Sequence, residues 1–168
     1  LADVAPGGVL LVLPLCTMKF QKPKLNPAQQ AVVDHGVLDS GFSVVLQMPT
    51  GAGKTWLARH AAESSVKKGY RVIFLSPLRA LATELAEDWQ KNFGDVPVGV
   101  FTSDYGQANR PKLPVSYADA RVLIMTPERL DVCTRNWRSH WDWIPEVDWL
   151  IIDEVHLLGD SNRGARLE

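Results

Sequence analysis

Five short apolar runs, rich in β-branched residues, recur along the chain and constrain its fold more than any other feature. Each run ends in a turn or a polar signal, and none shows the alternation of polar and apolar residues expected of a strand with one wet face. Continuous hydrophobicity of this kind is typical of strands buried on both faces of a parallel sheet. The five runs are Ser43–Gln47, Arg71–Leu75, Val98–Thr102, Arg121–Met125 and Val147–Ile152.

Helical stretches lie between these runs. Lys54–Lys68 is rich in alanine, and Leu78–Asn92 places Leu81, Leu85 and Trp89 on one apolar stripe. Alternating strands and helices predict an α/β domain with helices on both faces of a mainly parallel sheet. The N-terminal part offers two further elements. A helix is predicted over Asn26–Val37, with Asn26 as its N-cap and Pro27 as its first residue. Within residues 1–24, an extension of uncertain structure, Val9–Leu13 is a candidate strand.

Composition limits the class of protein without naming a partner. A chain of 168 residues that is 46% hydrophobic forms one globular domain, or one lobe of a larger protein, and is not disordered. The 18 basic and 19 acidic side chains nearly cancel, which argues neither for nor against nucleic acid. The two cysteines suggest a reducing, intracellular location, cytoplasmic or nuclear. The apolar run Gly7–Cys16 is about half the length of a membrane span, so no membrane partner is expected.

The segment Met48–Thr55 (MPTGAGKT) joins the first predicted strand to a helix. Glycines let the backbone curl until its N–H groups point inward, and the helix N-terminus adds partial positive charge. Lys54 would reach the β- and γ-phosphates of a nucleoside triphosphate, and the Thr55 hydroxyl would ligate Mg²⁺. Met48 stands where the general phosphate-loop pattern has glycine. The predicted nucleotide-binding residues of this loop are Thr50, Gly51, Ala52, Gly53, Lys54 and Thr55.

Two acids, Asp153 and Glu154, directly follow the last apolar run. A phosphate loop needs a carboxylate at the end of a neighbouring buried strand to hold hydrated magnesium. Asp153 is the candidate for that role, and Glu154 is the candidate base that orients and deprotonates the attacking water. The alternative, that both acids merely end a strand in solvent, is less favoured beside a phosphate loop.

These residues resemble those of a known family. Thr50–Thr55 (TGAGKT) and Asp153–His156 (DEVH) are similar to motifs I and II of superfamily 2 helicases. Ser76–Leu81 (SPLRAL) resembles motif Ia, and Thr126–Asp131 (TPERLD) resembles motif Ib. Leu25–Gln29 (LNPAQ) resembles the motif that reads adenine. The resemblance therefore covers residues 25–168.

The stretch after the DEVH box narrows the resemblance to the superkiller-like branch, which includes repair and RNA-remodelling helicases. The matching residues are His156–Asp160, Arg163, Gly164, Leu167 and Glu168. The resemblance implies a three-layer RecA-like motor lobe with a phosphate loop that binds ATP and Mg²⁺. Gln29 would lie near the adenine, and His156 would couple the ATP site to a second RecA-like lobe, expected in the same full-length chain.

The resemblance also implies a binding path for single-stranded or duplex nucleic acid, either DNA or RNA. Such a path is read through phosphates and sugars, so it does not require a high net charge. Ser103–Gly106 would lie along the same path. For Arg79 and Arg129, the alternative interpretation is that they are solvated side chains on helix surfaces. The candidate contacts are Pro77, Arg79, Thr102, Thr126 and Arg129.

Motif III and later helicase motifs are not found in the sequence, so this lobe is expected to bind Mg-ATP but to hydrolyse it poorly alone. In the family fold, the motif III strand lies between the strands of motifs I and II, and a gap is expected there. We hypothesise that Val9–Leu13 or a second copy of the chain fills the gap.

Two clusters are interpreted conservatively. Trp137, Trp141, Trp143 and Trp149 lie among basic residues and have the composition of a base-stacking platform, but their helical and strand spacing favours packing in the core or between domains. The four histidines lack metal-ligand spacing. Two other functions remain open. A phosphate-loop ATPase that acts without nucleic acid would be insensitive to added strands, and a nucleotide-binding interaction module would lack downstream motor motifs.

Overall fold

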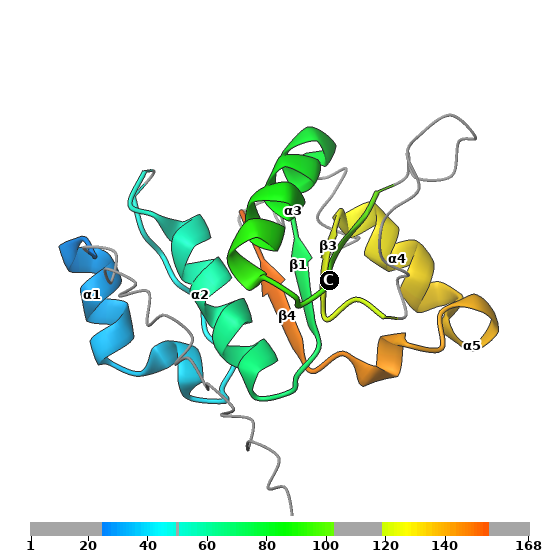
Figure 1. The fold of residues 1–168 in the computed structure, drawn as a ribbon, viewed down its shortest axis with the longest axis horizontal. Coiled ribbons are helices and arrows are strands. Elements are labelled where there is room, and N and C mark those ends of the chain that lie inside the picture. The colour runs from blue at the N-terminus through cyan, green and yellow to red at the C-terminus, as the bar shows by residue number, and fades with distance from the viewer. Residues whose placement is uncertain (1–24, 50, 103–118, 155–168) are drawn as a thin grey trace, which may run out of the picture.

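A single parallel sheet organises the chain. The computed structural model describes residues 25–49, 51–102 and 119–154. The sheet has the spatial order β2-β3-β1-β4, and every pairing is parallel (Figure 1). Its strands are β1 (Val72–Leu75), β2 (Val98–Phe101), β3 (Val122–Met125) and β4 (Trp149–Ile152). The predicted α/β class and four of the predicted strands are confirmed, each strand starting or ending within two residues of its apolar run.

Helices connect the strands and follow the sequence predictions closely. The helix predicted over Asn26–Val37 is shorter than expected, because Gly36 adopts a left-handed conformation and a separate turn follows. The described helices are α1 (Pro27–Asp34), α2 (Lys54–Lys67), α3 (Arg79–Phe93), α4 (Pro127–Arg135) and α5 (Trp137–His140). Two 3₁₀ turns, η1 (Val37–Asp39) and η2 (Ile144–Glu146), complete the described elements. In this part of the chain, no helix is long and apolar enough to cross a membrane.

The sheet carries a hydrophobic core on each face, which makes three layers. Alternate residues of a strand point to opposite faces. Val72 and Phe74 of β1 therefore pack under α2 and α3, where Trp89 is fully buried. Ile73 and Leu75 face the other way, against α4 and the segment that leads to β4.

The N-terminal edge of the sheet differs from the prediction. Ser43–Gln47 was expected to be a strand, but no strand forms there and no ladder hydrogen bond joins it to the sheet. The reason is that no strand lies beside it: a cavity separates this segment from β4, at the place where a gap was expected between the strands of motifs I and II, and Val45 is 79% exposed. For the same reason β4 is an edge strand, with Leu150 47% exposed, rather than one buried on both faces. Val9–Leu13, the candidate to fill the gap, lies outside the described residues.

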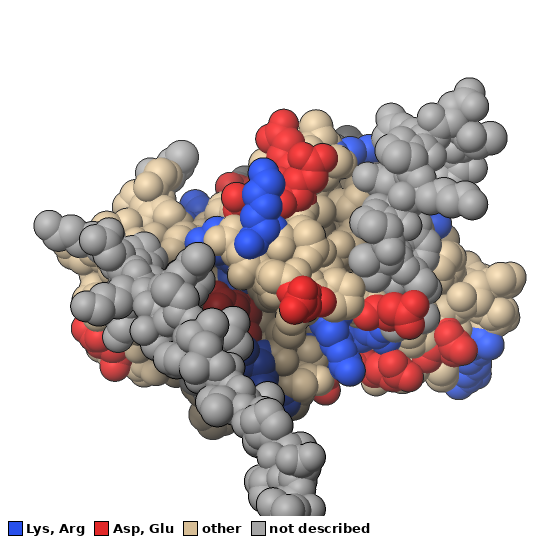
Figure 2. Space-filling view, viewed as in Figure 1, with Lys and Arg blue, Asp and Glu red and all other residues tan. Residues whose placement is uncertain are grey.

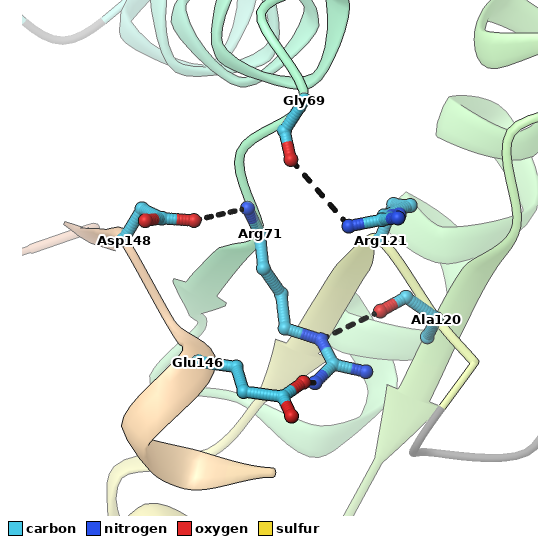
Figure 3. A network of polar contacts seen from close by, with 6 residues as sticks. All are labelled: Gly69, Arg71, Ala120, Arg121, Glu146 and Asp148. Atoms are coloured by element: carbon cyan, nitrogen blue, oxygen red, sulfur yellow. Dashed lines mark hydrogen bonds and ion pairs between the residues drawn. The ribbon is translucent and has the colours of Figure 1, made fainter.

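A buried arginine links the amino ends of β1, β3 and β4 (Figure 3). Arg71 donates from Nε to the Ala120 carbonyl at 3.0 Å and from Nη1 to Glu146 at 2.9 Å. Its backbone N–H donates to the carboxylate of Asp148 at 2.8 Å, and its guanidinium lies over the Trp143 ring. The network holds three strand starts in register at the end of the sheet opposite Asp153.

The tryptophan cluster divides between core and surface. Trp143 is buried in the second core, and Trp141 packs against that core, as predicted. Trp137 is 37% exposed and lies beside Arg138, so it does not pack in the core, and its packing against another domain stays a prediction. The reason is that α5 ends at His140, before a second turn can bring Trp137 and Trp141 onto one buried face.

Candidate nucleotide-binding site

The phosphate loop runs from the extended segment 43–49 into α2. Gly51 and Gly53 have φ values of +77° and +83°, in the left-handed region that favours glycine. Gly53 is also the N-cap of α2, and the Ala52 N–H donates to the Pro49 carbonyl at 3.2 Å. The predicted reason for glycine in this loop, a backbone that other residues rarely adopt, is therefore visible at both positions.

Lys54 and the two acids line one cavity of about 950 Å³. Lys54 is the first residue of α2, and its Nζ donates to the Met48 carbonyl at 3.3 Å. The cavity extends between α2, β4 and segment 41–48, and apolar side chains form much of its wall. It runs along β4 from Asp148 to Glu154, and Lys54, Asp153 and Glu154 line it where the phosphate loop meets the carboxyl end of that strand.

The backbone at the end of β4 explains how two consecutive acids reach the same cavity. The Asp153 N–H donates to the Leu75 carbonyl at 3.1 Å, which extends the β1–β4 ladder by one bond. Glu154 then adopts a left-handed φ of +55°, and its N–H donates to Asp153 Oδ1 at 3.0 Å. Successive residues of a strand point to opposite faces, so this turn is what allows Asp153 and Glu154 to line one cavity.

The residues present suit magnesium held together with a nucleotide. Mg²⁺ prefers oxygen ligands and is usually bound by one or two protein groups plus substrate phosphates. Asp153 supplies a carboxylate on the cavity wall, and Thr55 supplies an exposed hydroxyl on the first turn of α2. In the described ranges, no three His, Cys, Asp or Glu side chains gather as a metal-binding group.

Gln29 lies against the phosphate loop and is only 8% exposed. Its Oε1 accepts from the Asn26 N–H at 3.0 Å, while Asn26 Oδ1 accepts from the Gln29 N–H at 2.9 Å. This capping box was not predicted, although an N-cap asparagine followed three residues later by glutamine is its sequence signature. The same two side chains donate to carbonyls of the phosphate loop.

The candidate nucleic-acid residues follow the carboxyl ends of the other strands. Thr102 follows β2, Thr126 follows β3, and Pro77 and Arg79 come shortly after β1. The sheet order therefore places them in a row along the carboxyl ends of the strands, and Asp153, which follows β4, lies at the end of that row. Thr102 and Thr126 are each 2% exposed and offer almost no surface to a ligand in this structure, whereas Arg79 is exposed.

The guanidinium group of Arg129 stacks on two aromatic rings. Its guanidinium carbon lies 4.0 Å from the centre of the Phe101 ring and 5.5 Å from that of Trp141. Its Nε is buried without a hydrogen-bond partner. Stacking uses the face of the guanidinium group, and a phosphate would bind its edge. Thr50, His156 and Ser103–Gly106 lie outside the described residues.

A glycine loop between an extended segment and a helix, with acids at the end of a neighbouring parallel strand, defines a nucleotide-binding domain with a RecA-like fold. Similar folds occur in a hypothetical ATP-dependent RNA helicase from Sulfolobus tokodaii, with a TM-score of 0.61 and 19% identity over 85% of this chain and 40% of that one. The UvsW helicase of bacteriophage T4 gives a TM-score of 0.59 at 17% identity, covering 84% of this chain and 46% of that one.

Sequence comparison identifies the family. The family profile described as DEAD/DEAH box helicase matches residues 26–168, and the chain belongs to this family. It is 31% identical over 153 residues to the ATP-dependent DNA helicase Hel308 of Methanococcus vannielii, covering 86% of this chain and 19% of that protein. It is 37% identical over 132 residues to the chloroplastic DExH-box ATP-dependent RNA helicase DExH15 of Arabidopsis thaliana, covering 74% of this chain and 10% of that protein.

Proposed function

We propose that this chain is the ATP-binding lobe of an ATP-dependent helicase or translocase that acts on DNA or RNA. The observation that carries the proposal is that Lys54, at the start of α2, lines the same cavity as Asp153 and Glu154, which follow the carboxyl end of β4. Membership of the DEAD/DEAH box helicase family supports the motor function. Because the chain spans 19% of the length of the Hel308 relative, the activity belongs to a larger protein that contains this lobe.

The phosphate loop supplies binding and orientation. Its backbone N–H groups and the N-terminus of α2 would cradle the phosphates, which explains the left-handed glycines at Gly51 and Gly53. Lys54 would exchange its hydrogen bond to the Met48 carbonyl for contacts with the β- and γ-phosphates.

Asp153 and Glu154 have different proposed roles in hydrolysis. Magnesium, when bound, neutralises the charge that develops on the phosphates during transfer. Asp153 and the Thr55 hydroxyl are its candidate protein ligands. Glu154 would orient the attacking water and accept its proton, and it lines the same cavity as Asp153.

Nucleic acid would bind along the carboxyl ends of β2, β3 and β1, which the nucleotide does not cover. The order of the sheet supports a path from Thr102 past Thr126 to Pro77 and Arg79, beside the ATP site at β4. On the face shown in Figure 2, basic side chains lie beside acidic ones. Arg129, stacked on Phe101, would offer the edge of its guanidinium to a phosphate.

The parent protein is proposed to belong to the superkiller-like branch and to carry a second RecA-like lobe. The DEVH box and the residues after it, together with the similarity to Hel308 and DExH15, support this assignment. His156 would then couple the ATP site to the second lobe. The names of these two relatives include one DNA helicase and one RNA helicase, so the proposal covers both substrates.

The test is ATP turnover by the full-length protein with and without added single strands of DNA or RNA. We expect stimulation by at least one of them, and we expect Glu154→Gln to lower turnover by roughly 10²- to 10⁴-fold while ATP affinity stays unchanged. Turnover that ignores both kinds of strand would contradict the helicase proposal and favour an ATPase acting without nucleic acid. Loss of ATP binding in Glu154→Gln would contradict the role of Glu154 as base.

A further inference from the structure

Two aromatic rings stack on the outer side of α2. Trp56 and His60 are four positions apart, so their side chains lie one above the other on the helix. The ring centres are 5.0 Å apart, and the ring planes differ by 10°. Both residues are partly exposed, and neither belongs to the two hydrophobic cores. The buried residues of the helix lie on another side of it and are Leu57, Ala61, Ala62 and Ser65.

The stack leaves one face of the Trp56 ring turned toward the start of α2. Long side chains on a helix lean toward its N-terminus, so the His60 ring lies against the Trp56 face on the C-terminal side. The opposite face is turned toward the first turn, where Gly53 lies on the same side of the helix and has no side chain. In the described part of the chain, no second ring contacts Trp56. The ring is therefore held on one face and open on the other.

This open face lies next to the phosphate loop, on the side of α1. The Trp56 N–H donates to the Gly53 carbonyl at 3.1 Å, and a Cβ built on Gly53 would overlap with the Gln29 amide of α1. The other side of α2, with Leu57 and Ala61, lines the cavity that reaches the acids. A nucleotide held by its phosphates at the start of α2 thus finds a flat aromatic surface on the α1 side of the helix.

We propose that Trp56 is the base-stacking residue of the nucleotide site. The purine ring of ATP stacks on the face of Trp56 opposite His60, and His60 holds the indole in place, which lowers the cost of ordering it. The inference rests on the function proposed above, because it concerns the same nucleotide. Stacking uses ring area and reads no pattern of hydrogen bonds, so Trp56 favours the larger purine over a pyrimidine.

The decisive variant is Trp56→Leu. Leucine is apolar and a strong helix former, so it keeps α2 but removes the aromatic face. We expect the affinity for Mg-ATP to fall by roughly 5- to 20-fold, which corresponds to the loss of one base-stacking contact. The affinity for Mg-tripolyphosphate, which has no base, should stay unchanged, and Mg-CTP should lose less affinity than Mg-ATP. All three ligands are titrated by calorimetry into the variant and the unmodified protein.

Two further variants control for the change of side chain. Trp56→Phe keeps an aromatic ring and should retain most of the affinity for Mg-ATP. Trp137→Leu makes the same change at another partly exposed tryptophan, on α5. Figure 1 shows α5 at the opposite end of the molecule from α1. This control should bind all three ligands as the unmodified protein does.

The outcomes distinguish this inference from the proposed function. Failure of the unmodified protein to bind either Mg-ATP or Mg-tripolyphosphate would remove the proposed function itself. Normal binding by the unmodified protein and equal affinity for Mg-ATP in Trp56→Leu would overturn the inference alone. Equal losses for Mg-ATP and Mg-tripolyphosphate would also overturn it, because Trp56 would then support the loop or the helix. Normal binding of Mg-tripolyphosphate by Trp56→Leu would show that its phosphate loop is folded.

Discussion

Individual residues of the site differ in how far the sequence could predict them. The types and positions of Lys54, Asp153 and Glu154 follow from spacing, because the carboxyl ends of parallel strands meet at one edge of a sheet. The left-handed turn at Glu154 could not be predicted, since nothing in residue type forces a glutamate into that region. The hydrogen bonds from the side-chain amides of Asn26 and Gln29 to the phosphate loop could not be predicted for another reason, because their acceptors lie more than 20 positions away in the sequence.

Cys133 provides a test of packing at the residue scale. Burial raises the pKa of its thiol from 9.0 to about 11, and the nearby positive charge of Arg129 opposes part of this rise. The thiol therefore contributes its full stability below pH 9, and that contribution is lost between pH 9 and 11, where the unfolded chain ionises first. The residue lies on α4 and is fully buried in the second core.

The experiment uses a Cys16→Ser background, so that Cys133 is the remaining cysteine. We expect the free energy of unfolding, measured with urea, to fall by about 2 kcal/mol more between pH 8 and 10.5 than in a matched Cys133→Ala variant. Parallel pH profiles for the two proteins would show that the thiol is not buried as described.

At the scale of elements, the four strands of the sheet and the helices after them could be predicted because each carries its own signal. β1, β2 and β3 are continuous apolar runs and are fully buried. Segment 43–47 carries the same signal but forms no strand, because a strand also needs a neighbour within hydrogen-bonding distance. A run of apolar residues indicates burial, and it does not reveal whether the neighbouring place in the sheet is filled.

The Arg71 network tests how the amino ends of the strands are fixed. Arg71→Met should lower the free energy of unfolding by roughly 2–3 kcal/mol, because the buried Ala120 carbonyl loses a donor and Trp143 loses its cation. Glu146→Gln is the control. The Glu146 side chain is 70% exposed, so its loss should cost less than about 1 kcal/mol. Equal costs in the two variants, measured by urea unfolding, would refute this account of the network.

At the scale of the whole molecule, the order of the strand ends is the main functional feature. The sheet places the candidate nucleic-acid residues after β2, β3 and β1 and the acids after β4, so both candidate sites share one edge. Figure 1 shows α1 beside α2. This arrangement lets α1 contact the phosphate loop while the strand ends beyond remain available to a second ligand. The fold class could be predicted from the alternation of elements and the gap beside β4 from the missing motif III, whereas the hydrogen bonds between α1 and the phosphate loop could only be seen in three dimensions.

The central claim, that the loop beside this cavity binds the phosphates of ATP, is tested most directly by a calorimetric titration of Mg-ATP into the protein and its Lys54→Ala variant. We expect one binding site in the unmodified protein and an affinity about 10- to 100-fold lower in the variant, because the variant loses a charge-assisted contact to the phosphates. The melting temperature of both proteins without nucleotide serves as the control for folding. Equal affinities, or no binding by a folded, unmodified protein, would contradict the claim.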